Sequence, residues 1–317
     1  MTAPLHGKTL WMAPMAGITD KPFRQLVREQ GCQLAFTEMV SAKAILYNNR
    51  RTWNMLDLNG EDAVGVQLFG SEPEVMAEAA RIAQQQGAQV IDINMGCPVP
   101  KIVNNGEGAA LMRQPERAFA IVKAVAEAVS VPVTVKIRAG WDASSINAVS
   151  FTRGIAQAGA RAVTVHGRTR AQMYSGRACW EIIARVVQAV DIPVIGNGDV
   201  WSGAAAKEML RQTGCHGVML ARGVLGNPWL FAEAASALAG REYSPPSLRD
   251  RIFMAIRHLR MEVAYRGEKQ AVLFMRKHLA WYLKGLPGAS HLKRKIFAEQ
   301  SADVIANLLY RYIESAE

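Results

Sequence analysis

The chain has 317 residues, of which 50% are hydrophobic and 20% charged, and its formal net charge is +10 at pH 7. That length can bury one large core or two smaller ones, but no apolar run reaches the roughly 18 to 20 residues that a membrane-spanning helix requires. The four cysteines form no CxxC pair and have no metal-ligand spacing, so we expect free thiols and no bound metal. We also expect a cytoplasmic, monomeric protein with no membrane contact.

Short apolar runs, each bounded by glycine, proline or polar turns, recur along the first 230 residues. Eight such runs cover residues 9–15, 34–39, 63–70, 90–96, 133–138, 162–168, 194–199 and 217–222. Most are continuous and rich in β-branched residues instead of alternating with polar ones. This is typical of parallel strands that are covered on both faces.

Helical patterns lie between these runs. Residues 72–88 carry apolar side chains at helical spacing and end at Gly87, and residues 115–129 begin with Pro115 at a first-turn position. Eight strands that alternate with helices over about 230 residues predict a (β/α)8 TIM barrel. An open, doubly wound sheet is the alternative, although no GxGxxG motif follows the first strand.

The pattern changes after residue 240. Pro245 and Pro246 indicate a linker, and Ser247 with Asp250 three residues later predicts the start of a helix. A second helix is expected near residues 269–284, and one or two more between 290 and 316. The predicted fold class is therefore α/β, with a TIM barrel in residues 1–240 followed by a small helical-bundle domain in residues 241–317.

Positive charge is concentrated in this second domain. Residues 241–317 hold 14 lysines and arginines against 8 acidic residues, so a net charge of +6 lies in a quarter of the chain. The excess favours an acidic partner, with nucleic acid as the first candidate. A solvated helical surface with no partner is the alternative.

Polar residues occur at the carboxyl end of nearly every predicted strand, where a barrel of this type carries its chemistry. Taken singly, Gln67 or Asn94 could satisfy backbone groups in a turn, and His166 could be a structural hydrogen bonder. Lys136 is harder to explain in this way, because a lysine that ends an apolar strand must be paired or hydrated. Arg138 and Arg168 end two of the strands as well.

The last two of these loops, "GNGD" (196–199) and "ARG" (221–223), predict a phosphate site. Glycines let backbone N–H groups approach phosphate oxygens, and Arg222 adds a fork of donors. Loops after strands seven and eight often bind phosphate in this fold. We therefore expect a phosphorylated cofactor, with simple helix-capping glycines as the alternative.

Cys97 lies in the segment "VIDINMGCPVPK" (90–101), between a glycine and a proline. Pro98 disfavours helical geometry at Cys97, so the thiol is expected on an extended turn before the next helix. A free thiol has a pKa near 8.5 and is mostly protonated at neutral pH. No histidine adjoins it in the sequence, so the cysteine suits the role of proton donor better than that of nucleophile.

At these residues the sequence resembles the tRNA-dihydrouridine synthases, and most of all their bacterial B type. The segments that carry the resemblance extend over the whole chain and include "MAPMAGITDKPFR", "DINMGCPVPKIVNNGEGAALM", "VKIRAGWD", "VHGRTRAQMYSG", "PVIGNGDV", "ARGVLGNPWLF" and "FMRKHLAWYLKGLPGASHLKRKIF". Ala221 departs from the family pattern, which usually has glycine before the arginine.

The resemblance implies an FMN-bearing barrel and a helical tRNA-binding domain. NADPH or NADH would reduce FMN, the flavin would pass hydride to C6 of a uridine, and Cys97 would protonate C5. The residues that would hold FMN are Pro14, Met15, Ala16, Gln67, Lys136, His166, Asn197, Gly198, Asp199, Ala221 and Arg222. Those that would contact the uridine are Asn94, Lys101, Arg138 and Arg168.

The resemblance also suggests which side chains contact the RNA. Basic residues of the helical domain that would contact the tRNA backbone are Arg276, Lys277, Lys293, Arg294 and Lys295. Two other functions are left open by the residues themselves. One is an FMN barrel that acts on a free pyrimidine, in the manner of a dihydroorotate dehydrogenase, and the other is a catalytically silent RNA-binding barrel.

Overall fold

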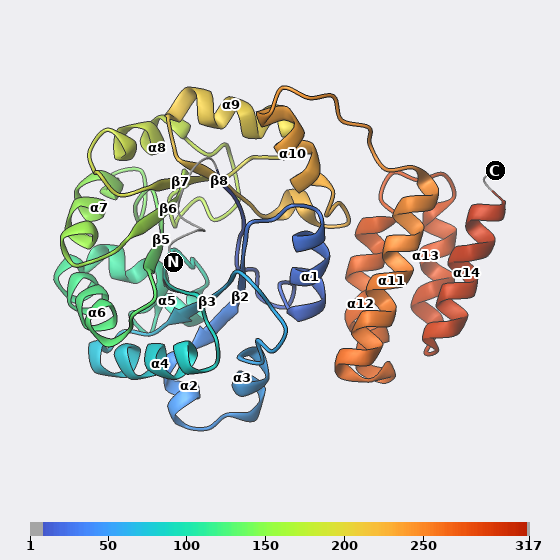
Figure 1. The fold of residues 1–317 in the computed structure, drawn as a ribbon, viewed down its shortest axis with the longest axis horizontal. Helices are drawn as coiled ribbons and strands as arrows, with labels where there is room; N and C mark the ends of the chain where they lie inside the picture. The colour runs from blue at the N-terminus through green and yellow to red at the C-terminus, as the bar shows by residue number, and fades with distance from the viewer. Residues whose placement is uncertain (1–8, 316–317) are drawn as a thin grey trace.

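The computed structural model describes residues 9–315, so the outer ends of the two predicted domains, residues 1–8 and 316–317, lie outside the described residues. Eight parallel strands form a closed barrel in chain order (Figure 1). The strands are β1 (Thr9–Met12), β2 (Leu34–Ser41), β3 (Val64–Phe69), β4 (Val90–Met95), β5 (Val133–Arg138), β6 (Ala162–His166), β7 (Val194–Asn197) and β8 (Gly217–Leu220). The TIM barrel is thus confirmed, and the open sheet is excluded because β1 pairs with β8.

The helices form an outer ring around the barrel and a separate bundle beside it (Figure 1). Those of the ring and its loops are α1 (Lys21–Glu29), α2 (Ala42–Leu46), α3 (Arg50–Met55), α4 (Pro73–Gln85), α5 (Pro100–Val103), α6 (Pro115–Ala128), α7 (Ala148–Gln157), α8 (Trp180–Val187), α9 (Gly203–Thr213) and α10 (Leu230–Leu238). The described residues also form two short 3-10 helices, η2 (Gly108–Arg113) and η3 (Arg222–Val224). The sequence did not predict α2 and α3, which follow the β2 strand.

The barrel interior changes from apolar to polar along its axis. Buried side chains from six of the strands form one hydrophobic cluster, in which the rings of Trp11 and Phe36 lie 5.7 Å apart. Further along, Gln67, Asp92 and Thr134 are aligned in register on β3, β4 and β5. Because inward positions recur every second residue, the polar row is followed by another near the carboxyl ends of the strands.

The helical bundle comprises α11 (Leu248–Arg266), α12 (Glu268–Tyr282), α13 (Ala289–Ala298) and α14 (Ala302–Glu314). The predicted start of α11 is confirmed, since Ser247 and Asp250 form a reciprocal capping box. The bundle has its own hydrophobic core, to which Leu26 of α1 also belongs. Within residues 9–315, none of the helices combines the length and the apolar composition needed to span a membrane.

Charged groups join the bundle to the barrel. Arg266 hydrogen-bonds to Asp20, which caps α1, and also to Glu262 at 2.5 Å. Glu262 lies 3.5 Å from the ring nitrogen of His258, and all of these groups except Arg266 are buried. At a second point, the Lys277 ammonium donates a hydrogen bond to the carbonyl oxygen of Gly17, in the loop after β1. The two parts of the chain therefore share a polar, largely buried interface.

Candidate active site

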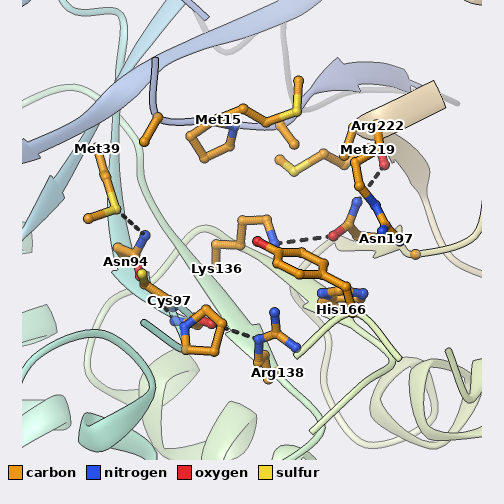
Figure 2. Close-up of a pocket in the computed structure, with 18 of the residues that line it drawn as sticks. Met15, Met39, Asn94, Cys97, Lys136, Arg138, His166, Asn197, Met219 and Arg222 are labelled. Carbon is orange, nitrogen blue, oxygen red and sulfur yellow. Dashed lines mark hydrogen bonds between the residues drawn. The ribbon is translucent and has the colours of Figure 1, made fainter. Parts of the chain in front are cut away.

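A pocket of about 600 Å³ opens at the carboxyl ends of the barrel strands. Its lining comes from the loops or ends of all eight strands, and Figure 2 shows Met15 on one side facing Lys136 on the other. The structure places nearly all of the predicted barrel residues in this lining, namely Pro14, Met15, Ala16, Gln67, Asn94, Cys97, Lys101, Lys136, Arg138, His166, Asn197, Gly198, Asp199, Ala221 and Arg222.

Lys136 projects into the pocket from β5. Its ammonium donates a hydrogen bond of 3.2 Å to Oδ1 of Asn197, whose Nδ2 in turn donates to the backbone oxygen of Met219 at 2.7 Å (Figure 2). Burial, and secondly the nearby Arg138 guanidinium, lower the pKa of Lys136 to about 8. The side chain is therefore a cation at neutral pH that is held in one position but only weakly hydrated.

His166 and Arg222 lie at the opposite end of the pocket from Cys97. Burial and four surrounding cations, Lys136 first among them, lower the pKa of His166 well below its usual value, so its ring is neutral. Arg222 lies over the rings of Tyr174 and Trp201, at 4.9 and 5.3 Å from their centroids. This end of the pocket is thus rich in positive charge and in neutral hydrogen-bonding groups.

The loop after β7 has a backbone that favours close approach. Gly198 has φ of +116°, and a Cβ at this position would lie 2.8 Å from the His166 ring. Asp199, with φ of +58°, accepts hydrogen bonds from Arg168 at 2.8 and 2.9 Å and from the Ala178 N–H at 2.7 Å. The glycine is required by the geometry of the loop, and Asp199 fixes the loop in place.

Arg168 is the predicted barrel residue that does not line the pocket. Its guanidinium is buried and donates to the carbonyl oxygens of Ser175 and Gly176 as well as to Asp199. With its donors directed at these loops, Arg168 holds the β6 and β7 loops together. Arg168 therefore lies outside the pocket lining, and its expected contact with a substrate uridine stays a prediction.

Cys97 lies in the irregular turn between the end of β4 and the start of α5, outside any helix, and its position before the next helix is as the sequence predicted. The Cys97 N–H donates to Oδ1 of Asn94 at 2.9 Å, and the Cys97 carbonyl accepts from the Ala109 N–H at 3.0 Å. Gly108 passes so close that a Cβ there would lie 2.9 Å from that carbonyl. Burial raises the pKa of the Cys97 thiol, so it is protonated at neutral pH.

Arg138 supports the same turn from β5. Its guanidinium donates to the carbonyl oxygens of Gly96 at 2.8 Å, Thr169 at 2.9 Å and Met173 at 2.8 Å. It also lies 5.7 Å from the centroid of the Tyr174 ring. Arg138 therefore joins the cysteine turn to the loop after β6 while one face of it lines the pocket.

Sequence reasoning missed several residues of the site. Asp92 is fully buried beneath the pocket, and Met39, Met219, Tyr174 and Trp201 contribute to its walls. Tyr174 and Trp201 are each 54% exposed, which is unusual for aromatic rings in a folded chain. The signal available in the sequence was Asp92 itself, an acidic residue inside a mostly apolar strand.

The basic residues predicted to grip RNA fall in two places. Arg294 and Lys295 are exposed on α13 and Lys293 is half-buried there, whereas Arg276 and Lys277 are half-buried on α12. The Lys277 ammonium is directed at Gly17 of the barrel and lies 3.9 Å from the centroid of the Phe274 ring. Lys277 thus contacts the barrel in this structure, and its expected contact with a phosphate stays a prediction.

The residues present fit a phosphorylated flavin. The pocket volume suits a planar ring system, its walls are largely apolar, and its polar groups converge from different strands. The loop at Gly198 leaves room that any Cβ would fill, and Lys136 and Arg222 supply positive charge at two separate points.

Comparison with known proteins points to one family. The sequence profile described as "Dihydrouridine synthase (Dus)" matches residues 11–316. "Probable tRNA-dihydrouridine synthase 1" of Synechocystis sp. is 46% identical to this chain, and the match covers 99% of this chain and 88% of that protein. "tRNA-dihydrouridine synthase B" of Xanthomonas axonopodis pv. citri is 42% identical, with 96% and 92% covered.

Solved structures give a more distant likeness. Histamine dehydrogenase from Rhizobium sp. 4-9 superposes with a TM-score of 0.56 at 14% identity, which covers 82% of this chain and 50% of that structure. At so low an identity the likeness shows the barrel fold alone. The family profile and the curated relatives, by contrast, extend over almost the whole sequence, and on these grounds the chain belongs to the dihydrouridine synthase family.

Proposed function

We propose that this protein is a flavin-dependent tRNA-dihydrouridine synthase, which reduces the C5=C6 bond of a uridine in tRNA. The observation that carries the proposal is the convergence of a protonated thiol, Cys97, and a half-buried ammonium, Lys136, on one pocket that fits a flavin. The names of the curated relatives support tRNA as the substrate.

The residues that would hold FMN divide by the part of the cofactor they suit. Arg222 and the loop at Gly198 would bind the phosphate, and Met15 would pack against the ring. Lys136, held by Asn197, would face the ring and neutralise negative charge on it. When bound and reduced by NADPH or NADH, FMN would supply the hydride that C6 of the uracil receives.

Cys97 would supply the proton. A hydride added at C6 and a proton added at C5 together saturate the double bond, and the resulting thiolate regains its proton from solvent. This role needs a thiol that is protonated at rest, and burial raises the pKa of Cys97 accordingly. Asn94 and Arg138 would hold the turn and contact the uracil, and the exposed Lys101 would lie at its edge.

The helical domain would bind the tRNA backbone through Arg276, Lys293, Arg294 and Lys295. The target base must leave the RNA stack to enter a pocket in the barrel, at a cost of a few kcal/mol. Contacts with phosphates would offset that cost, and they need no base specificity. Residues 1–240 would thus be the catalytic domain and residues 241–317 the RNA-binding domain.

The proposal is tested by mass mapping of dihydrouridine in tRNA from cells that lack this protein, with the purified protein, FMN and NADPH added back. The expected result is the loss of dihydrouridine at one or more positions and its return on addition of the protein. Unchanged dihydrouridine at every position would contradict the proposal. Reduction of a free pyrimidine but not of tRNA would favour the small-molecule alternative, and a colourless protein that still binds tRNA would favour the silent one.

A further inference from the structure

Asp92 is a carboxylate at the centre of the barrel, with no exposed surface. It lies on β4 in register with Gln67 on β3 and Thr134 on β5, and both neighbours hydrogen-bond to it at 2.6 Å. Burial raises the pKa of Asp92 to about 6, while the bonds from Gln67 and Thr134 act in the opposite direction. A buried charge of this kind is costly unless its neighbours compensate for it.

A chain of hydrogen bonds leads from Asp92 to the cysteine turn. Gln67 donates through Nε2 to Asp92, and its Oε1 accepts from Nδ2 of Asn94 at 2.7 Å. Oδ1 of Asn94 then accepts from the N–H groups of Gly96 at 3.2 Å and Cys97 at 2.9 Å. Three polar side chains in a row, those of Asp92, Gln67 and Asn94, thus connect the barrel centre to the backbone of Cys97.

The direction of this chain is fixed at both ends. An ionised carboxylate only accepts hydrogen bonds, so the amide of Gln67 must turn its NH₂ group toward Asp92 and its oxygen toward Asn94. Backbone N–H groups only donate, so Asn94 must turn its oxygen toward Gly96 and Cys97. Each primary amide has two orientations that differ by a flip, and only one orientation of each satisfies both ends.

We propose that Asp92 is a positioning residue for Cys97, which acts by fixing the amide orientations of Gln67 and Asn94 and thereby the turn that carries the thiol. Asp92 does not itself touch Cys97. The placement of the thiol follows from the hydrogen-bond geometry alone, and only its catalytic consequence rests on the proposed function. The competing role for Asp92 is that of a counter-charge to Lys136, which its carboxylate also influences.

Two substitutions separate position from charge. In Asp92→Asn, the new Oδ1 can still accept from Gln67 while Nδ2 donates to the Thr134 hydroxyl, so the chain keeps its direction although the charge is gone. In Asp92→Leu, a side chain of similar size leaves Nε2 of Gln67 without an acceptor, so the Gln67 amide is held only through its bond from Asn94 and can shift. Thr134→Val is the matched control, because it removes the other partner of Asp92 and leaves the chain toward Cys97 intact.

The readout that does not depend on turnover is the rate at which iodoacetamide alkylates Cys97 in the full chain. A Cys179→Ala background removes the other half-buried thiol, and Cys32 and Cys215 are buried. We expect Asp92→Leu to change the alkylation rate several-fold and to lower dihydrouridine formation by about tenfold or more. Asp92→Asn and Thr134→Val should both stay within about threefold of the parent in both measurements.

Two results would overturn the proposal. If Asp92→Asn and Asp92→Leu lower dihydrouridine formation equally, Asp92 acts by compensating charge. If Asp92→Leu changes neither the alkylation rate of Cys97 nor dihydrouridine formation, Asp92 is a packing residue. If Asp92→Leu does not fold, Asn94→Asp replaces it, because it sets two acceptors against each other at Gln67 and should perturb alkylation in the same way. If neither the parent nor any variant forms dihydrouridine but the alkylation rates of Cys97 differ as expected, the proposed function fails and the positioning role stands.

Discussion

Two side chains in the pocket both keep a proton at neutral pH, although burial shifts their pKa values in opposite directions. It raises the pKa of the Cys97 thiol and lowers that of the Lys136 ammonium to about 8. Burial favours the neutral form of both groups, and the neutral form is the protonated one for a thiol and the deprotonated one for an amine. At pH 7 the result is a thiol that keeps its proton beside an amine that is still charged.

Replacement of Cys97 by alanine should separate cofactor chemistry from product formation. The variant should bind FMN and be reduced by NADPH as the parent is, because the thiol is needed only to protonate C5. Dihydrouridine formation should fall by about 10²-fold or more, which is the usual scale for a positioned general acid. Cys179→Ala, at another half-buried thiol, is the control and should be as active as the parent, and parent-like turnover by Cys97→Ala would end the assignment.

The pH dependence of flavin binding should follow the protonation of Lys136. The ammonium is charged below its pKa, so the affinity of the flavin-free protein for FMN should decline as the pH rises through about 8, instead of near 10 as for an ordinary lysine. Quenching of flavin fluorescence measures this affinity at each pH. Lys136→Arg keeps a permanent charge and should flatten the decline. An affinity that is constant up to pH 10 in the parent would contradict the prediction.

Arg222→Ala should weaken FMN binding, since it would remove the proposed charge-assisted contact with the phosphate, worth roughly 1.5–3 kcal/mol. The purified variant should lose its yellow colour and regain it in excess FMN. Arg222→Lys, which keeps the charge but not the fork of donors, should retain an intermediate affinity. If titration gives the parent affinity for Arg222→Ala, the phosphate binds elsewhere.

At the scale of elements, α13 carries the clearest basic surface of the helical domain. Lys293, Arg294 and Lys295 are consecutive, and the last two are exposed. Consecutive residues on a helix diverge by about 100°, so these three cover a broad surface and not a narrow stripe. Such a surface suits the irregular backbone of a folded RNA better than it suits a single small anion.

Reversal of Lys293, Arg294 and Lys295 to glutamate should weaken tRNA binding and leave reduction of FMN by NADPH unchanged, because the flavin pocket lies in the barrel. Each lost phosphate contact should lower the slope of log affinity against log salt by about 0.7–0.9. Lys123, Arg185 and Lys207, exposed on barrel helices, are the control set with the same change in net charge. Equal slopes in the variant and the parent would show that α13 does not touch the RNA.

The elements that the sequence predicted well are those with a local signal. All eight strands appear within a few residues of their apolar runs, and the capping box of α11 depends on residues only three apart. Helices α2 and α3 were missed because they are five and six residues long, too short for an apolar period to show.

Within the site, strand ends located most of the pocket, since parallel strands bring their carboxyl ends together whatever their sequence. The partners of Asp92 lie 25 and 42 residues away, so its hydrogen bonds could not be read from its neighbours. The same holds for Lys277, whose partner Gly17 is 260 residues distant, and for Arg168, whose loops had no predicted conformation. Contacts of this kind depend on how loops and domains pack, which single-residue chemistry does not reveal.

At the scale of the whole molecule, the two domains meet around a carboxyl group that resists ionisation. Burial, and then the neighbouring Glu262, raise the pKa of Asp20 to about 7, whereas His258 and Arg266 lower it. Lys277 and Tyr265 of the bundle are the other titratable groups that sense Asp20. The folded protein thus keeps a proton at this interface that the unfolded chain releases near pH 4.

Asp20→Asn should therefore stabilise the protein, and the gain should depend on pH. The folded state binds the extra proton between about pH 4 and pH 7, so the contribution of Asp20 to stability falls as pH rises through that range. Asparagine still caps α1, and at pH 8 the gain should be on the order of 1–3 kcal/mol by urea denaturation. Near pH 4 it should vanish.

Asp250→Asn should change the stability at pH 8 in the opposite direction and serves as the comparison. Hydrogen bonds from Ser247 lower the pKa of Asp250, so this carboxylate stabilises the folded state above its unfolded pKa, and its loss should destabilise the protein at pH 8. If Asp20→Asn destabilised the protein at pH 8 as well, the carboxyl group at the interface would have to be ionised and paired with Arg266.

The bond from Lys277 to Gly17, with Leu26 of the barrel packed into the core of the bundle, has an evolutionary consequence. A recombination event that transplanted the helical domain of one relative onto the barrel of another would disturb the loop that begins the pocket as well as the proposed RNA-binding surface. Substitutions at residue 277 and in the loop after β1 should consequently accumulate together along lineages. Selection for a new RNA target would then act on catalysis and on recognition at the same time.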